Sequence, residues 1–199
     1  FMCDPQIIRK IVAAAKLKNS DTVLEIGAGR GDLTGFLAKK AGTVIAIEKD
    51  EKLWKILFKT FGKSKNVEIV HGNALKEIEK LEFNKIVSNL PYAILEPLFK
   101  KLMEKRFSLA VLTVSSLFFE KMKADPLLSS FFEMEMLFPV PKAAFDPPPR
   151  TESIVIRVTP RNGGRGPFLI RQVFLRKGLI KNSLREGMIA YERLQGRNM

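Results

Sequence analysis

The sequence is poor in the residues that build metal sites, disulfides and histidine-based catalysis. Among its 199 residues it has one cysteine, Cys3, and one histidine, His71. A single cysteine excludes a disulfide within the chain and a cluster of thiolate ligands. A single histidine argues against a Ser-His-Asp triad or a zinc site, so we expect no bound metal. Because cysteine is so rare, a reducing compartment is favoured, and we expect a cytoplasmic protein.

Negative charge and long apolar runs are scarce as well. The sequence has 21 Asp and Glu against 34 Lys and Arg, which gives a net charge of +13 and a pI of about 9.9. No apolar run approaches the ~18 residues of a membrane span, and the first residues lack a signal-peptide pattern. The positive charge therefore favours a polyanionic partner, nucleic acid before an anionic membrane. A basic protein without a specific anionic partner is the alternative.

Short β-branched runs alternate with helical stretches over the first 115 residues. They predict five strands and, between them, helices that begin near Leu33 and span 51–61; the strands are expected at 22–26, 43–47, 67–70, 84–88 and 109–114. Strands joined by helices predict an α/β fold with a mostly parallel, doubly wound sheet. Two further strands are expected at 131–138 and 153–158, where an antiparallel strand is common.

The last part of the sequence differs in composition from the rest. We expect a first domain over 1–160, a linker at 160–167, and a short basic helical segment over 161–199. This segment has nine Lys and Arg against two Glu, a surplus of seven positive charges and more than half of the total. Its apolar residues could pack on the body while its basic face meets phosphate, as in a shortened RNA-binding domain.

A glycine-rich segment follows the first predicted strand. It reads Glu25-Ile26-Gly27-Ala28-Gly29-Arg30-Gly31, and such glycines allow a tight turn and a close approach of ligand to backbone. The G-x-G-x-G spacing differs from the G-x-G-x-x-G of dinucleotide binders, and no Gly-Lys-Ser/Thr of a P-loop follows. An acid before G-x-G-x-G matches the turn that binds the amino-acid end of S-adenosylmethionine.

The next two predicted strands end in side chains suited to an adenosine group. Glu48 ends the second strand, 21 residues after Gly27, where a carboxylate can accept both ribose hydroxyls. The alternative is a solvent-facing acid beside Lys49. Asn73, followed by Ala74, could bond the adenine edge or cap a helix.

The fourth predicted strand ends in Ser88-Asn89-Leu90-Pro91-Tyr92. An aromatic amine is a poor nucleophile because its lone pair is delocalised into the ring. Two acceptors, the side-chain oxygen of Asn89 and the backbone carbonyl of Leu90, could bond the amine protons and free that lone pair. Pro91 would stiffen the turn and Tyr92 would stack on the base. Such catalysis by position and electrostatics needs no ionisable base.

A base must leave its stack to reach this turn, and a second aromatic ring could hold its other face. Phe145, before Pro147-Pro148-Pro149-Arg150, is the candidate. The alternative is a core phenylalanine beside a proline turn. Arg150 could contact a phosphate.

These motifs together resemble the ribosomal RNA adenine dimethyltransferase family (KsgA type). The resemblance covers residues 1 to about 158, and its most specific parts are Asn-Leu-Pro-Tyr and Phe-x-Pro-Pro-Pro in this order. The matching segments are Phe1-Met2-x-Asp4, Glu25-Ile26-Gly27-x-Gly29, Ile47-Glu48, Gly72-Asn73-Ala74-Leu75, Asn89-Leu90-Pro91-Tyr92 and Phe145-x-Pro147-Pro148-Pro149-Arg150. The sequence departs from the family at 113–119, where Thr-Val-Ser-Ser-Leu-Phe-Phe replaces a stretch that contains Gln-Lys-Glu.

The resemblance implies a Rossmann-like class I methyltransferase that dimethylates two adjacent adenosines near the 3′ end of small-subunit ribosomal RNA during ribosome biogenesis. It implies S-adenosylmethionine as cofactor and the ribosomal RNA of a pre-small subunit as partner. The catalytic residues are then Asn89, Leu90, Tyr92 and Phe145. The cofactor-binding residues are expected to be Met2, Glu25, Gly27, Ala28, Gly29, Glu48, Lys49, Asn73, Ala74 and Asn89.

Other functions fit parts of the same pattern. An Asn-x-Pro-Tyr turn suits any planar amine, so a methyltransferase acting on DNA adenine or on a protein glutamine is a second interpretation. A scaffold that binds ribosomal RNA without turnover is a third, supported by the altered stretch at 113–119. We expect a monomer that does not bind membranes.

Overall fold

The computed structural model describes residues 1–161, except for the side chain of Tyr92. The predicted basic segment and most of the predicted linker lie outside the described residues.

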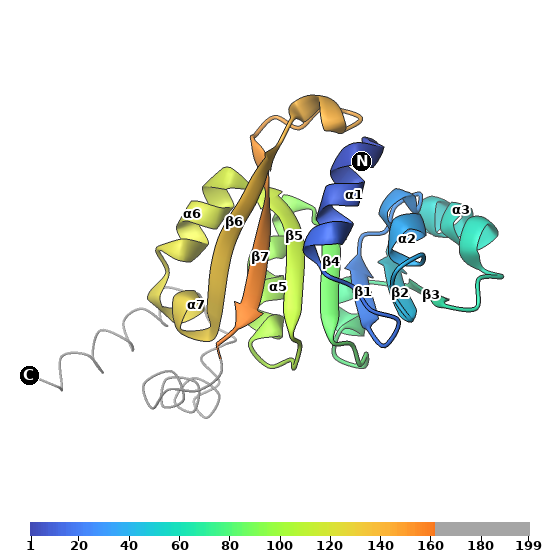
Figure 1. Cartoon of the computed structure of the whole chain (residues 1–199), viewed down its shortest axis with the longest axis horizontal. Coiled ribbons are helices and arrows are strands. Elements are labelled where there is room, and N and C mark those ends of the chain that lie inside the picture. Colours follow the sequence, from blue (N-terminus) through green and yellow to red (C-terminus); the bar gives the residue numbers. More distant parts are fainter. Residues whose placement is uncertain (162–199) are drawn as a thin grey trace, which may run out of the picture.

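One sheet of seven strands forms the centre of the molecule (Figure 1). Its order is β3-β2-β1-β4-β5-β7-β6, with the first five strands parallel and β7 antiparallel to both of its neighbours. The strands span Thr22–Ile26 (β1), Thr43–Glu48 (β2), Val67–His71 (β3), Lys85–Asn89 (β4), Leu109–Ser115 (β5), Phe132–Val140 (β6) and Ser153–Pro160 (β7). The predicted mostly parallel sheet with an antiparallel late strand is confirmed.

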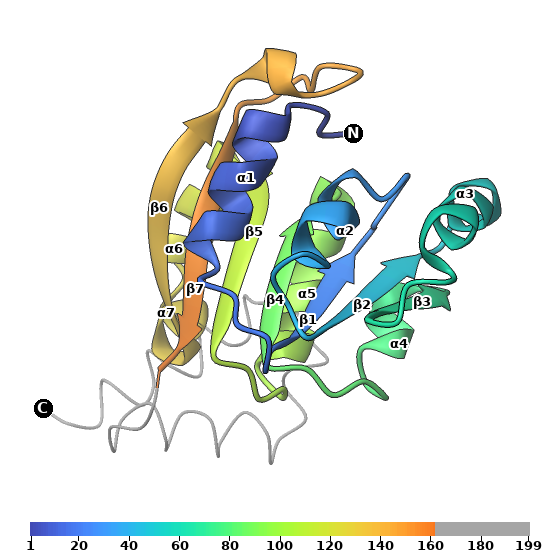
Figure 2. The ribbon, with the colours of Figure 1, turned by 45° about the vertical axis from the view of Figure 1, so that its right-hand side comes forward.

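Helices cover both faces of this sheet, as Figure 2 shows from a second side. They span Pro5–Ala14 (α1), Asp32–Leu37 (α2), Glu51–Phe61 (α3), Ala74–Glu77 (α4), Leu95–Leu102 (α5), Ser116–Lys123 (α6) and Pro126–Phe131 (α7), with 3-10 turns at Tyr92–Ile94 and Lys142–Ala144. Residues of α1 and α2 share one core cluster with Val23, Val87 and Val111. Residues of α4 to α7 share the other cluster with Leu24 and Ile86. Apolar residues on both faces explain why the strands read as continuous hydrophobic runs.

A buried ion pair lies at the amino-terminal edge of the sheet. The Nζ of Lys85 lies 2.9 Å from Oδ2 of Asp21 and donates to the carbonyls of Ala15 and Lys16 at 3.1 and 2.8 Å. Asn84 donates its Nδ2 to the other oxygen of Asp21 at 2.8 Å. Burial alone would raise the pKa of Asp21, but the hydrogen bonds from Lys85 and Asn84 outweigh it and lower the pKa below 3.8. This network joins the end of α1 to β1 and β4.

Candidate active site

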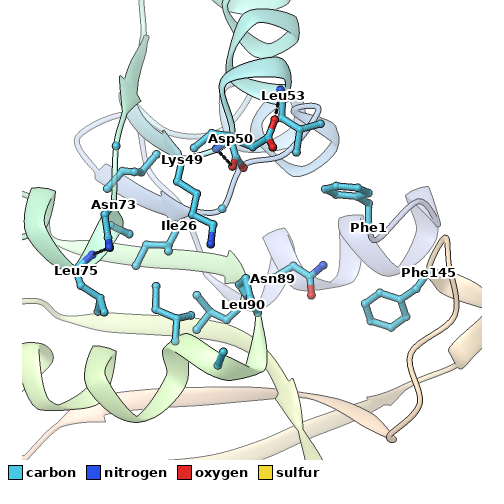
Figure 3. Close-up of a pocket in the computed structure, with 18 of the residues that line it drawn as sticks. Phe1, Ile26, Lys49, Asp50, Leu53, Asn73, Leu75, Asn89, Leu90 and Phe145 are labelled. Carbon is cyan, nitrogen blue, oxygen red and sulfur yellow. Dashed lines mark hydrogen bonds between the residues drawn. The ribbon is translucent and has the colours of Figure 1, made fainter.

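A cavity of about 610 Å³ opens at the carboxyl edge of the parallel strands (Figure 3). Ligands bind at this edge in doubly wound sheets. The lining residues follow β1 to β4 and the loop before β7: Phe1, Ile26, Gly27, Ile47, Glu48, Lys49, Asp50, Leu53, Gly72, Asn73, Ala74, Leu75, Asn89, Leu90, Pro91, Ala93, Ile94, Phe145, Pro147 and Pro149.

The glycine turn after β1 forms one wall. Gly27 has φ 71°, and the N–H groups of Gly27 and Ala28 donate to the carbonyl of Ile47 at 2.8 and 3.1 Å. Gly31 has φ 94°, and a Cβ there would lie 2.4 Å from the ring of Phe61. Both positions therefore need glycine, one for the turn and one for the contact with α3.

Glu48 is buried at the end of β2 with both carboxylate oxygens oriented. Its Oε2 accepts the N–H of Gly29 at 2.8 Å and its Oε1 accepts the N–H of Asp50 at 2.9 Å. A carboxylate oxygen can accept more than one hydrogen bond, so both remain able to accept ribose hydroxyls. The two backbone bonds fix the carboxylate and tie it to the glycine turn.

Glu25 lies behind this wall and does not line the cavity. Its side chain is 2% exposed, and Thr34 donates its Oγ1 to Oε2 of Glu25 at 2.6 Å. Burial, with smaller repulsion from Asp32 and Glu48, raises the pKa of Glu25 to about 8. The carboxyl is therefore mostly neutral at pH 7 and holds α2 against β1 as a hydrogen-bonding group.

Asn73 begins α4, and its Oδ1 accepts the N–H of Leu75 at 3.0 Å. The helix-cap alternative from the sequence is thus confirmed, but the same side chain lines the cavity. The cap occupies Oδ1 and leaves the Nδ2 hydrogens for a ligand. Lys49, also on the wall, projects toward the middle of the cavity in Figure 3.

Asn89 is the last residue of β4, beside Thr113 of β5. The N–H of Leu90 donates to the carbonyl of Thr113 at 3.3 Å, which fixes the start of the turn. Within the described part of the chain, neither the Asn89 carboxamide nor the Leu90 carbonyl has a hydrogen-bond partner. The two predicted acceptors therefore have no partner among the described residues.

The ring of Phe145 is half-buried and faces the same cavity as Asn89 (Figure 3). The first residues hold its loop: Met2 pairs with Phe145 as an antiparallel bridge, and the N–H of Cys3 donates to the carbonyl of Ala144 at 2.9 Å. Met2 itself is buried beside α1 and does not line the cavity. Its position indicates support for the loop of Phe145.

The sequence thus identified most of the polar residues at this cavity. Gly27, Glu48, Lys49, Asn73, Ala74, Asn89, Leu90 and Phe145 line it, whereas Met2, Glu25, Ala28 and Gly29 lie behind its walls. Tyr92 begins the 3-10 turn, and its stacking role stays a prediction. The sequence missed the apolar wall made by Phe1, Ile26 and Leu53. Leu53 carried a signal, because it is one turn into a helix that begins right after Glu48.

The sequence of the chain matches the family model for ribosomal RNA adenine dimethylase over residues 1–177. The chain belongs to the ribosomal RNA adenine dimethylase family. It is 43% identical over 171 residues to a probable ribosomal RNA small subunit methyltransferase A of Methanosarcina barkeri, which covers 81% of this chain and 59% of that protein. A protein of the same name from Thermococcus sibiricus is 41% identical over 81% of this chain and 62% of its own length.

Solved structures of dimethylases and related proteins share the fold. A dimethyladenosine transferase from Plasmodium falciparum superposes with a TM-score of 0.75 and 32% identity, covering 85% of this chain and 65% of that one. The 23S rRNA methyltransferase ErmE gives 0.74 at 24% identity and covers 96% and 84%. The chain spans about three fifths of the length of the curated relatives it matches.

Two further findings, on metal sites and on membrane-spanning helices, concern residues 1–161 alone. Within 1–161, no group of three or more His, Cys, Asp or Glu side chains is placed to hold a metal ion. His71 is exposed and stacks on Trp54, with ring centroids 4.9 Å apart. None of the described helices is long and apolar enough to cross a membrane.

Proposed function

We propose that this chain transfers methyl groups from S-adenosylmethionine to the exocyclic amines of adenosines near the 3′ end of small-subunit ribosomal RNA. One observation carries the proposal. Asn89, whose carboxamide has no partner within the described residues, faces Phe145 across a cavity that the fixed carboxylate of Glu48 also lines. Family membership supports the substrate class.

The cavity suits S-adenosylmethionine in its hydrogen-bond acceptors and donors. Glu48 would accept the ribose hydroxyls, and the Nδ2 of Asn73 would donate to the adenine edge. The apolar side chains of Ile26 and Leu53 would enclose the ring. The left-handed turn at Gly27 exposes backbone close to the cavity, where the amino-acid end would lie. When bound, this cofactor supplies an electrophilic methyl group.

The catalytic turn would make the adenine amine more nucleophilic. Asn89 Oδ1 and the Leu90 carbonyl would each accept a hydrogen bond from one hydrogen of the amine. These two bonds favour a tetrahedral nitrogen with a free lone pair. Fixed acceptors of this kind act where charge develops in the transition state. The ring of Phe145 would stack on the flipped base, with Tyr92 on its other face, as stacking holds extruded bases.

A transfer assay with labelled S-adenosylmethionine tests the proposal. The full chain is incubated separately with undermethylated small ribosomal subunits, with DNA and with a glutamine-containing protein substrate. We expect label only in the subunits, recovered as dimethyladenosine. Label in DNA or protein would identify another amino-methyltransferase, and binding to subunits without label would identify a scaffold. We further propose that the protein acts in the cytoplasm as a monomer. Sedimentation of the active protein tests the monomeric state.

A further inference from the structure

A basic groove lies between α1 and α2, away from the cofactor cavity. It has a volume of about 370 Å³ and is lined by Arg9, Val12, Ala13, Lys16, Leu17, Phe36, Lys39 and Lys40. Both helices cover the same face of the sheet (Figure 1). The polar side chains of this lining are all cationic, so the groove forms a local concentration of positive charge.

Two of the four cations of the groove contact one aromatic ring. The guanidinium of Arg9 lies 5.7 Å from the centroid of Phe36 and the Nζ of Lys39 lies 5.5 Å from it. Such cation–π contacts hold long side chains in place and leave their N–H groups to bind another partner. Within the described residues, none of the four groove cations forms an ion pair.

Lys16 occupies a backbone position where glycine is favoured. Its φ is 46°, and no other non-glycine residue among the described residues has a positive φ. This left-handed conformation directly after a helix disfavours side chains with a Cβ. Lys16 therefore places a cation at the groove at some cost in backbone strain.

Helix α1 links the surroundings of the cavity to the groove. The segment before α1 contacts the loop of Phe145, and α1 then runs toward the opposite edge of the sheet (Figure 2). The second half of α1 and the residues after it line the groove. A helix of ten residues spans about 15 Å at 1.5 Å per residue. A strand of RNA that leaves the cavity can therefore reach the groove within a few nucleotides.

We propose that the groove binds the phosphate backbone of the substrate RNA a few nucleotides away from the modified adenosine. The inference rests on the proposed function, since it concerns the same RNA. A cation that follows a helix also interacts favourably with the helix dipole, which accounts in part for Lys39 and Lys40 just after α2. The helix dipole does not account for Arg9 in the middle of α1 or for Lys16, whose backbone is left-handed.

The salt dependence of RNA binding tests the groove. The affinity of the full chain for a 3′-terminal fragment of small-subunit ribosomal RNA is measured from 50 to 300 mM KCl. The triple variant Arg9→Gln, Lys16→Gly, Lys39→Gln should weaken binding about tenfold or more at low salt and reduce the slope of log K against log salt by about 2, since each phosphate contact contributes about 0.7–0.9. A control triple, Lys59→Gln, Lys63→Gln, Lys65→Gln, removes the same charge near the end of α3 and should have little effect.

The single variant Lys16→Gly separates binding from folding. Glycine relieves the strain and keeps the carbonyl that Lys85 contacts, so the melting temperature should rise by about 2–4 °C. RNA affinity should nevertheless fall about threefold. A rise in melting temperature with unchanged RNA affinity overturns the role of Lys16 in binding.

The outcomes distinguish this inference from the proposed function. Suppose that the wild-type chain methylates the RNA but the groove triple and the control triple have the same slope of log K against log salt. The groove then does not bind the RNA. If the slope depends on the groove but no methyl is transferred, the groove is supported and the enzymatic proposal fails. A groove triple that loses binding to phosphatidylserine vesicles while its RNA binding is unchanged would indicate a membrane surface and overturn the RNA assignment.

Discussion

The two ends of strand β1 place a buried carboxyl group in opposite surroundings. Asp21, just before the strand, is paired with Lys85, and its pKa is lowered. Glu25, near the end of the strand, has a threonine as its hydrogen-bond partner, and its pKa is raised to about 8. Burial raises the pKa of both groups; the hydrogen bonds from Lys85 and Asn84 outweigh it at Asp21, whereas the single hydrogen bond from Thr34 does not outweigh it at Glu25.

This contrast extends to the edges of the sheet. At the amino-terminal edge, Asp21 binds both Lys85 and Asn84, and Lys85 also donates to two carbonyls that follow α1. At the carboxyl edge, Asn89 and the Leu90 carbonyl have no partner among the described residues, although backbone bonds fix the strands and turns that present them. Polar groups that bind each other stabilise the fold, whereas fixed groups without a protein partner are available for a ligand.

Loss of the Asn89 carboxamide should have the largest effect and should act mainly on the rate of methyl transfer. We expect Asn89→Ala to reduce the rate of methyl transfer about 10²–10³-fold, since it removes one acceptor fixed at the reacting amine. The affinity for S-adenosylmethionine, measured by calorimetry, should fall only modestly. Asn84→Ala, the matched change at the other edge, should lower the melting temperature and leave the transfer rate unchanged. Full activity of Asn89→Ala would contradict the mechanism.

Removal of the cation at the amino-terminal edge should have the opposite profile. Lys85→Met leaves Asp21 buried without its partner, which costs about 3–5 kcal/mol of unfolding free energy. Urea unfolding measures this loss, while the transfer rate per folded molecule should be unchanged. Because the folded pKa of Asp21 is depressed, the wild-type contribution is present above pH 3.8 and is lost as the pH falls through the lowered pKa. The double variant Asp21→Asn, Lys85→Met should recover part of the stability; no recovery would mean that the pairing is not what Lys85 contributes.

The sequence predicted the parallel strands well because each is a short apolar run, and the first four end at a motif. The predicted strand 22–26 matches β1, and the helix at 51–61 matches α3. Less was predicted for 115–131, where α6 and α7 form. These helices are short, and their signals are local: Ser115 and Asp125 accept backbone N–H bonds at their first turns.

The candidate site was predictable where a residue type is tied to a strand end, as at Glu48 and Asn89. It was not predictable where contacts join distant segments. The bridge between Met2 and Phe145 joins residues 143 positions apart, and neither side carries a pairing signal. The partner of Glu25 is also set by packing, because the sequence does not indicate that α2 brings Thr34 onto β1.

The raised pKa of Glu25 predicts a stability that decreases with pH. The folded state holds a proton on Glu25 that the unfolded state releases near pH 4.5, so unfolding free energy should fall between about pH 4.5 and about pH 8. Glu25→Gln keeps a neutral group beside Thr34 and should remove this dependence. At pH 8.5 the variant should be more stable than the wild type by on the order of 2–4 kcal/mol, since one pKa unit corresponds to about 1.4 kcal/mol. Parallel pH profiles of the two proteins in urea unfolding would show that Glu25 is ionised in the folded state.

The smallest effect should come from Asn73, which combines both kinds of role. Its Oδ1 caps α4, and its Nδ2 is available at the cavity. Asn73→Ser retains a good cap but shortens the side chain, so the melting temperature should stay the same while S-adenosylmethionine binds about fivefold more weakly, the loss of one hydrogen bond of about 1 kcal/mol. Asn73→Ala removes the cap as well and should lower stability by about 1 kcal/mol. If the serine variant binds the cofactor as tightly as the wild type, Asn73 acts as a cap alone and belongs with Asp21 and Lys85 among the groups that serve the fold.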